Sequence, residues 1–240
     1  MTDKFNAYID GYNLYYGALR DRPDLKWLDL RALAKSYFTT VELDKVYFFS
    51  AKIGQKYEGD AAPKRQSVYW KALRENGVEI VEGHFTDPPR HLPLAERSVQ
   101  EAFLPKPVFN AEGFQLHYSK LFEQSRPRLP EVSVRKQTEK GSDVNLATYL
   151  LRDVYKSGLK YALVITADSD LAGALKLARE EEVFIALSAA RREGTIIPAE
   201  LVAHADFVEN IKPIQLEESQ LNKVVRSRTG RELIRPKEWT

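Results

Sequence analysis

The sequence contains no cysteine and no long apolar run. Without cysteine, the chain forms no disulfide, no iron–sulfur cluster, no cysteine-ligated zinc site and no thiol nucleophile. Because an oxidising compartment offers such a chain nothing to cross-link, this absence favours a reducing cytoplasm. The apolar runs are strand-sized, as at Tyr161 to Ile165, whereas a membrane helix needs about 20 apolar residues. Since the polar start of the chain also lacks a signal-peptide pattern, we expect a cytoplasmic protein without a membrane partner.

A large excess of charge of one sign is also missing. The 36 Lys and Arg residues against 34 Asp and Glu residues leave a net charge of +2, which excludes a polycation that coats nucleic acid along its whole surface. Hydrophobic residues make up 43% and charged residues 29% of the chain, as in globular rather than disordered proteins. A chain of 240 residues can bury a sizeable core.

Short apolar runs alternate with amphipathic segments along most of the chain. The runs predict strands at Phe5–Ile9, Val46–Phe49, Val78–Val81, Tyr161–Ile165, Val183–Leu187 and Ala205–Val208. The amphipathic segments predict helices at Tyr12–Leu19, after Asp29, and at Lys64–Glu75, Val144–Tyr155 and Leu171–Arg179. Strands that alternate with helices predict the α/β class, here a three-layer sandwich around a mainly parallel central sheet.

The alternation stops between Gly83 and Arg135, where seven of the 12 prolines lie. Prolines at this density predict loops and short elements, so we expect an insertion at about residues 84–135 within a domain of residues 1–212. The remaining residues, 213–240, form a tail that is basic because Lys and Arg outnumber acids there.

Acidic residues follow two of the predicted strands and open one helix. Asp10 ends the first strand, Asp168 and Asp170 follow the Tyr161–Ile165 strand, and Asp143 precedes the helix before that strand. Ligands of open parallel sheets bind at the edge formed by the carboxyl ends of the strands. Two like charges about 4 Å apart cost on the order of 4 kcal/mol at an effective dielectric of 20, so we expect protonation or a bound cation. Oxygen ligands suit Mg²⁺ or Mn²⁺.

Each of these motifs also has an ordinary structural interpretation when taken alone. Asp10-Gly11 is typical of a turn, Asp143 of a helix N-cap, and Thr166 to Asp170 of a strand-to-helix connection. Their joint placement at strand ends is what indicates a site.

Three segments resemble the signature of the NYN-domain family, LabA-like proteins with a PIN-like nuclease fold. They are Ile9-Asp10-Gly11-Tyr12-Asn13-Leu14, Glu139-Lys140-Gly141-Ser142-Asp143-Val144 and Thr166-Ala167-Asp168-Ser169-Asp170-Leu171. The resemblance spans roughly Phe5 to Val208. Many members have a glycine where this chain has Ala167, and a hydrophobic residue where it has Ser142, but neither departure removes an acid.

The resemblance implies a metal-dependent endoribonuclease that hydrolyses RNA with Mg²⁺ or Mn²⁺. Carried over by position, Asp10, Asp143 and Asp168 would hold the metal and Asp170 would be a fourth catalytic acid. Asn13, Thr166 and Ser169 would be polar partners of the metal, the phosphate or a water. The basic start of the Lys64–Glu75 helix adds Arg65 and Gln66 as candidate RNA contacts, and Lys140 could touch a phosphate; a solvated helix face is the plainer alternative.

Other functions remain as alternatives with different support. The insertion and the basic tail are also compatible with an RNA-binding or regulatory interaction module with weak or no cleavage, and with a protein partner or a homodimer. A haloacid-dehalogenase-type phosphatase would need a second Asp two residues after Asp10, where Tyr12 stands. A Rossmann dehydrogenase would need a G-x-G-x-x-G loop after the first strand, where Gly11 stands alone.

Overall fold

The computed structural model describes residues 3–55, 57–86, 89–93, 131–135, 138–190 and 196–240. The chain forms two compact units, one of Met1–Phe85 with Glu139–Thr240 and one of Thr86–Thr138. In the second unit, strands β4 (Pro89–Pro93) and β5 (Glu131–Arg135) pair antiparallel. Residues 94–130, most of the expected insertion, lie outside the described residues.

The first unit is built on a seven-stranded sheet with the strand order β6-β3-β2-β1-β7-β8-β9. The five pairings from β3 to β9 are all parallel, so the predicted mainly parallel sheet is confirmed. The strands are β1 (Lys4–Asp10), β2 (Glu42–Ala51), β3 (Val78–Thr86), β6 (Thr138–Lys140), β7 (Tyr161–Ile165), β8 (Phe184–Ala189) and β9 (Phe207–Asn210).

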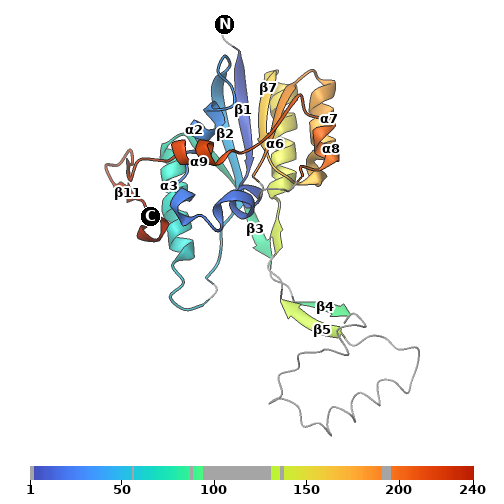
Figure 1. Cartoon of the computed structure of the whole chain (residues 1–240). Coiled ribbons are helices and arrows are strands. Elements are labelled where there is room, and N and C mark those ends of the chain that lie inside the picture. The colour runs from blue at the N-terminus through green and yellow to red at the C-terminus, as the bar shows by residue number, and fades with distance from the viewer. Residues whose placement is uncertain (1–2, 56, 87–88, 94–130, 136–137, 191–195) are drawn as a thin grey trace, which may run out of the picture. The chain divides into compact units, whose positions relative to one another are not determined.

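Helices cover both faces of this sheet, as Figure 1 shows. The helices of the first half are α1 (Gly11–Leu14), η1 (Tyr15–Leu19), η2 (Pro23–Leu25), α2 (Leu30–Lys35) and α3 (Ala62–Glu75). Those of the second half are α6 (Ser142–Ser157), η3 (Ser169–Leu171), α7 (Ala172–Glu180), α8 (Ala199–Val202) and α9 (Pro213–Glu218). No helix among the described ranges is long and apolar enough to span a membrane.

Strand β1 shows why the sequence forms three layers. Successive side chains of a strand point to opposite faces, and those of β1 are buried on both. Phe5 and Ile9 pack in one apolar core with residues of α2 and α3, whereas Tyr8 packs in a second core with residues of α6 and α7. Two cores separated by one sheet are a three-layer α/β arrangement, as the sequence predicted.

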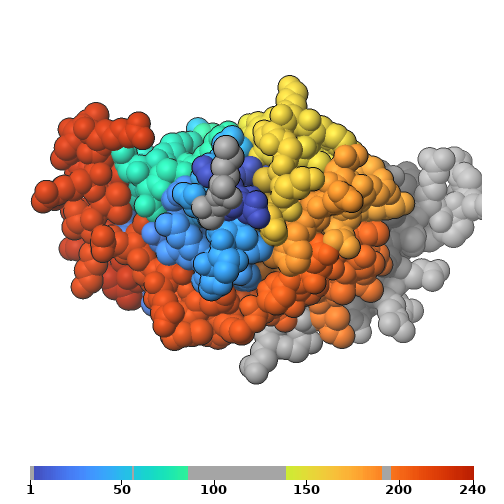
Figure 2. Space-filling model, turned by 90° about the horizontal axis from the view of Figure 1, so that it is seen from above, coloured from blue at the N-terminus to red at the C-terminus, as the bar shows by residue number. Residues whose placement is uncertain are grey.

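The carboxyl-terminal tail is a packed part of the first unit. It contains β10 (Val224–Arg226) and β11 (Glu232–Ile234), which pair antiparallel, and η4 (Lys237–Trp239). The Trp239 ring lies 5.8 Å from that of Tyr69 and 6.3 Å from that of Trp27, centroid to centroid. In Figure 2 this orange-red segment runs along one side of the unit toward the green α3 region. The partner-binding role expected for the tail stays a prediction.

Candidate active site at the carboxyl edge of the sheet

The strand order reverses at β1, which makes the carboxyl ends of β1 and β7 the natural binding edge. The chain runs outward from β1 through β2 and β3 on one side, and through β7, β8 and β9 on the other. In open α/β sheets, ligands bind in the crevice at this reversal. Asp10 is the last residue of β1, and Thr166 directly follows β7, so both predicted segments meet at the reversal.

Asp10 is held in place by hydrogen bonds to both carboxylate oxygens. Its Oδ1 accepts from the backbone N–H groups of Tyr12 and Asn13, each at 3.0 Å, and so caps α1. Its Oδ2 accepts from Thr166 Oγ1 at 3.0 Å and from Asn13 Nδ2. Asp10 is only 1% exposed. Burial raises the pKa of Asp10, while these hydrogen bonds oppose the rise. The side chains of Asn13 and Thr166 therefore hold the Asp10 carboxylate in position.

Asp168 and Asp170 stand at the start of the next helical segment. Asp168 Oδ1 accepts from the backbone N–H of Asp170 at 3.0 Å, and so caps η3. The backbone N–H of Asp168 donates to Thr166 Oγ1 at 3.1 Å, which links this loop to Asp10. Ser169 and Asp170 are exposed and Asp168 is half-buried. The loop after β7 thus presents two carboxylates to solvent beside the buried Asp10.

The site also shifts the ionisation of Asp143 toward the neutral form. It lies in the first turn of α6 and is half-buried. Burial raises the pKa of Asp143 to about 6, and the negative charges of Asp10, Asp168, Glu139 and Asp170 add to the rise. These couplings show that the four predicted acids, joined by Glu139, share one electrostatic environment. We call these five residues the acidic edge.

Glu139 belongs to the acidic edge although the sequence singled out only its neighbours. Its Oε1 accepts from Ser142 Oγ at 2.7 Å and from Ser142 N at 3.3 Å. A Cβ atom on Gly83 of β3 would lie 2.4 Å from that Oε1 and 2.8 Å from the backbone oxygen of Lys140, so glycine leaves the space that Glu139 uses. Gly141, with φ of 97°, makes the left-handed turn that starts α6 and directs Asp143 to the edge.

The acidic edge does not form a metal cage. Within the ranges that the structure describes, no group of three or more acidic or histidine side chains is placed to hold a metal ion. Both oxygens of Asp10 and Oδ1 of Asp168 instead accept hydrogen bonds from backbone, amide and hydroxyl donors. Acids at strand ends can be caps as readily as ligands, and the sequence alone does not separate these uses.

Two of the three basic and amide candidates have structural partners within the chain. Arg65 lies in the first turn of α3 and forms an ion pair of 3.0 Å with Glu238 of η4. The side-chain amide of Gln66 is bound to the backbone, since it donates to Ala51 O and accepts from Ile53 N, each at 3.0 Å. Lys140 is exposed beside Glu139. Substrate binding by Arg65, Gln66 and Lys140 stays a prediction.

Three tyrosines that were not among the predicted site residues follow Asp10 within six positions. Tyr12, Tyr15 and Tyr16, here called the tyrosine patch, are 48%, 39% and 44% exposed. Their rings are in contact, with centroid distances of 4.4 Å for Tyr12–Tyr16 and 5.2 Å for Tyr15–Tyr16. The run of tyrosines after the strand is the signal that could have found them, but the apolar pattern there predicts only an ordinary amphipathic helix.

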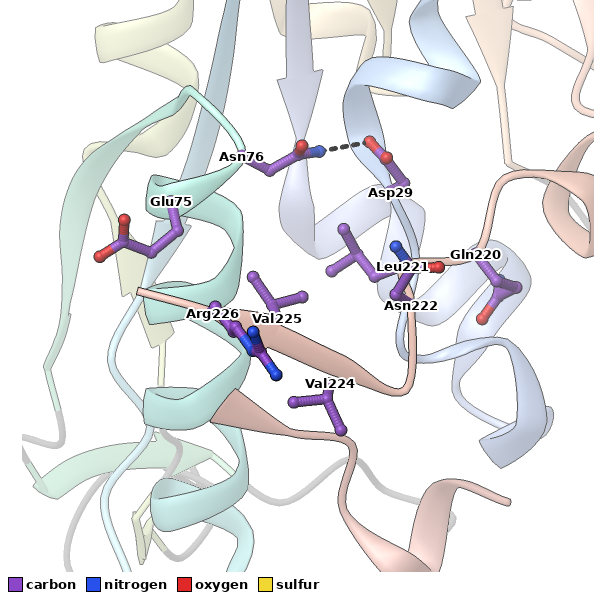
Figure 3. Close-up of a pocket in the computed structure, with 9 residues that line it drawn as sticks. All are labelled: Asp29, Glu75, Asn76, Gln220, Leu221, Asn222, Val224, Val225 and Arg226. Atoms are coloured by element: carbon purple, nitrogen blue, oxygen red, sulfur yellow. Dashed lines mark hydrogen bonds between the residues drawn. The ribbon is translucent and has the colours of Figure 1, made fainter. Parts of the chain in front are cut away.

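A cavity lies elsewhere, beside the tail (Figure 3). It has a volume of about 250 Å³ among the described residues, and its walls come from the start of α2, the end of α3 and the segment before and within β10. Asn76 and Asp29 are joined across it by a hydrogen bond of 2.7 Å. Because α3 runs from the carboxyl end of β2 to the start of β3, its last residues lie toward the opposite edge from Asp10.

Comparisons with known proteins give a match in sequence over nearly the whole chain. No family model matches the chain. The chain is 27% identical over 263 aligned residues to 6-hydroxy-3-succinoylpyridine 3-monooxygenase HspA of Pseudomonas putida (strain DSM 28022 / S16), covering 97% of this chain and 74% of that protein. Among solved structures, a protein of unknown function from Vibrio parahaemolyticus RIMD 2210633 matches 88% of this chain and 94% of its own, with 12% identity and a TM-score of 0.47.

The relative corrects the functional predictions made from the sequence. A protein that matches nearly the whole chain is named as a monooxygenase, which is an oxidoreductase and not a hydrolase. The predicted endoribonuclease is therefore wrong, and so is the alternative of an interaction module in place of an enzyme, whereas RNA as a partner stays a prediction. The predicted Mg²⁺ or Mn²⁺ cofactor is wrong as well, because the relative has another chemistry and the described acids form no metal-holding group. The expected homodimer and protein partner stay predictions.

Proposed function

We propose that the chain is an enzyme, and that it is a monooxygenase acting on a hydroxylated aromatic ring. The observation that carries this proposal is the 27% identity over 97% of the chain to a monooxygenase whose named substrate is a hydroxypyridine. Because the match covers nearly the whole chain, it is not confined to one short motif of the sheet or of the acidic edge. The size of the shared region is what favours a shared reaction class.

The reaction places a definite demand on the protein. One atom of dioxygen is inserted at a ring carbon and the other leaves as water, which consumes two electrons and two protons. A reduced nicotinamide or a reduced flavin supplies the electrons. A ring hydroxyl that loses its proton pushes electron density onto the ring, and so assists attack by an electrophilic oxygen. The enzyme therefore needs a base near neutral pH.

Asp143 is the residue whose properties suit that base. The pKa of Asp143 is raised to about 6 by burial and by its acidic neighbours, which is close to the optimum for proton transfer at neutral pH. Asp10 is fully buried and already accepts four hydrogen bonds, so it positions the loop after β7 rather than exchanging protons with substrate. The negative charges of Asp168 and Asp170 help to keep the pKa of Asp143 raised.

A resident flavin does not fit the cavity beside the tail. Its volume of about 250 Å³ is below the roughly 300–1,000 Å³ of ordinary cofactor pockets. Glu75 and Asp29 in its wall would also repel the phosphate of a flavin nucleotide. In this proposal the electron donor therefore acts as a cosubstrate and not from that cavity.

Oxygen incorporation tests the proposal directly. The purified chain is incubated under ¹⁸O₂ with 6-hydroxy-3-succinoylpyridine and with NADH, alone or with FMN or FAD, and the products are analysed by mass spectrometry. We expect one ¹⁸O atom in the ring product. Asp143→Asn should lower the rate by roughly 10²–10⁴-fold as expected for loss of a general base, while Asp44→Asn, at the far end of β2, should not. A product without label, or none with any donor, contradicts the proposal.

We also propose that the sheet is a PIN-like variant of the NYN type. The proposal is supported by the three sequence segments that resemble the NYN signature and by their meeting at one sheet edge. It concerns the fold alone, because one fold hosts many chemistries. An experimental structure tests it, and an antiparallel pairing of β1 with β7 would contradict it.

A further inference from the structure

The tyrosine patch is unusual because it leaves three neighbouring aromatic rings in solvent. Exposed aromatic side chains that cluster, rather than scatter, mark binding surfaces. Here the rings of Tyr12 and Tyr16 are tilted by 39° and those of Tyr15 and Tyr16 are nearly perpendicular, at 87°. Such rings offer both a face and an edge to a flat ligand.

Cations line one side of the tyrosine patch. The Arg20 guanidinium carbon lies 5.5 Å from the Tyr16 ring centroid, and Lys26 Nζ lies 5.3 Å from that of Tyr15. The charge of Arg65 also reaches Tyr15, and Asp21 is the acid that acts against these cations there. The quadrupoles of the rings attract these cations and hold them beside the patch. This side of the patch therefore suits an anionic group.

The other side of the tyrosine patch leads to the acidic edge. Burial raises the pKa of Tyr12, and the negative charge of Glu139 adds to the rise while Arg20 opposes it. The side chain of Tyr12 is therefore close enough to feel both the negative charge of Glu139 and the positive charge of Arg20. A ligand that lies along the patch meets donors at one end and carboxylates at the other.

Two glycines fix the tyrosine patch across the sheet edge. A Cβ on Gly11 would lie 2.8 Å from the backbone oxygen of Phe49 at the end of β2, and one on Gly17 only 1.6 Å from that of Ala190 after β8. The segment between them includes a π-helical turn, in which Arg20 N donates to Tyr15 O at 2.7 Å. Such turns are rare and occur frequently at functional sites. These contacts place the patch over the carboxyl edge of the sheet.

We propose that the tyrosine patch binds the ring of a hydroxylated aromatic carboxylic acid, with its carboxylate at Arg20 and its ring hydroxyl toward the acidic edge. The inference rests on the proposed function, for which it names the substrate class and the subsite. The ring stacks on tyrosine, the carboxylate pairs with a guanidinium, and the hydroxyl donates to a carboxylate. A polyanion such as RNA fits less well, because Asp10 accepts from the backbone of Tyr12 and the charge of Glu139 reaches its side chain.

Calorimetric titration of the full chain with 6-hydroxynicotinic acid tests the subsite, and 6-hydroxynicotinamide serves as the neutral probe. We expect the acid to bind more tightly than the amide. Arg20→Gln should weaken acid binding by about tenfold, as for loss of a charged hydrogen bond, and remove the preference for the acid. Tyr16→Leu should weaken both probes. Arg228→Gln, at a side chain that is 90% exposed in the tail, should change neither.

Three outcomes would overturn the subsite. Equal binding of acid and amide, or an Arg20→Gln variant that binds the acid like the wild type, removes the role of Arg20. Binding of a short oligouridylate that Arg20→Gln weakens, without binding of the acid, would make the patch a nucleic-acid surface. Acid binding without ¹⁸O incorporation supports the subsite and rejects the proposed reaction. Incorporation of ¹⁸O at a rate that Arg20→Gln leaves unchanged supports the proposed reaction and rejects the subsite.

Discussion

Asp10 and Asp143 are the same residue type at the same edge, yet their surroundings give them different roles. Asp10 is fully buried, and both of its oxygens accept hydrogen bonds. Asp143 is half-buried and faces the charges of Asp10, Asp168, Glu139 and Asp170. Burial raises the pKa of both residues, but hydrogen bonds oppose the rise at Asp10, whereas negative neighbours add to it at Asp143.

The raised pKa of Asp143 predicts a loss of stability as pH rises. Its pKa is about 6 in the folded chain against an ordinary value of 3.8, so the folded state holds this proton longer than the unfolded state does. The free energy of unfolding should therefore fall as pH rises from about 4 to about 6, and stay lower above. Because Asp143 is half-exposed, solvent screening limits the effect to about 1 kcal/mol.

Urea unfolding of Asp143→Asn across this pH range measures the effect. The variant should match the wild type near pH 4 and exceed it at pH 7.5, because asparagine carries no charge. Asp44→Asn, an exposed position on β2, is the matched control and should leave the pH dependence as it is. An Asp143→Asn variant with the wild-type pH slope would show that another group causes it.

At the scale of elements, the segment after β1 depends on tight backbone contact. The sequence predicted one helix at Tyr12–Leu19, whereas the structure forms α1 followed by the π-helical η1. Gly17 faces the backbone of Ala190 with no room for a side chain. The predicted helical segment is therefore confirmed, whereas its π-helical turn and this contact between distant segments are features that the local pattern does not contain.

Gly17→Ala should destabilise the chain by about 1–3 kcal/mol, the usual cost of overpacking. The new methyl group would meet the Ala190 carbonyl oxygen, so η1 would have to move. Gly173 in α7 is the matched control, because a Cβ there meets no atom within 4 Å. Gly173→Ala should stabilise by up to about 0.5–1 kcal/mol through helix propensity. Urea midpoints compare the two, and equal effects would contradict the close packing.

The strands and the long helices could be predicted because their signal is local. The apolar run at Tyr161–Ile165 coincides with β7, and the stripe from Val144 lies within α6. The acids of the site were found because parallel strands bring their carboxyl ends together. Glu139 and the tyrosine patch were missed, since Glu139 depends on the space left by Gly83, and the exposure of the tyrosines depends on how η1 crosses the edge.

At the scale of the whole molecule, the tail stabilises the first unit through a few aromatic and polar contacts. Trp239 packs against Trp27 and Tyr69. Arg235 Nη2 donates to the backbone oxygen of Asp24 at 2.6 Å, and its Nε donates to that of Trp239 at 2.7 Å. Glu238 pairs with Arg65. These contacts join the end of the chain to α3 and to the segment before α2.

Trp239→Ala should release the tail while leaving the sheet folded. Because the β10–β11 pair is short, it should open locally once the ring contacts are lost, and trypsin should then cut faster at Arg226, Arg228 and Arg231. Limited proteolysis followed by mass spectrometry measures the rate. Ile234→Ala is the matched control, since that side chain is 59% exposed, and its rate should equal the wild type. An unchanged rate for Trp239→Ala would contradict a packed tail.

The central position of β1 also has a consequence for how the protein is made. Its two neighbours, β2 and β7, both lie downstream in the chain. In the pairing with β7, Phe5 is aligned with Tyr161, which is synthesised much later. At a synthesis rate of about 5–20 residues per second, the edge of β1 that pairs with β7 stays unpaired for many seconds, until β7 has been made. The nascent chain therefore exposes an unpaired, hydrophobic strand edge for that time, which is the period in which it most needs a chaperone.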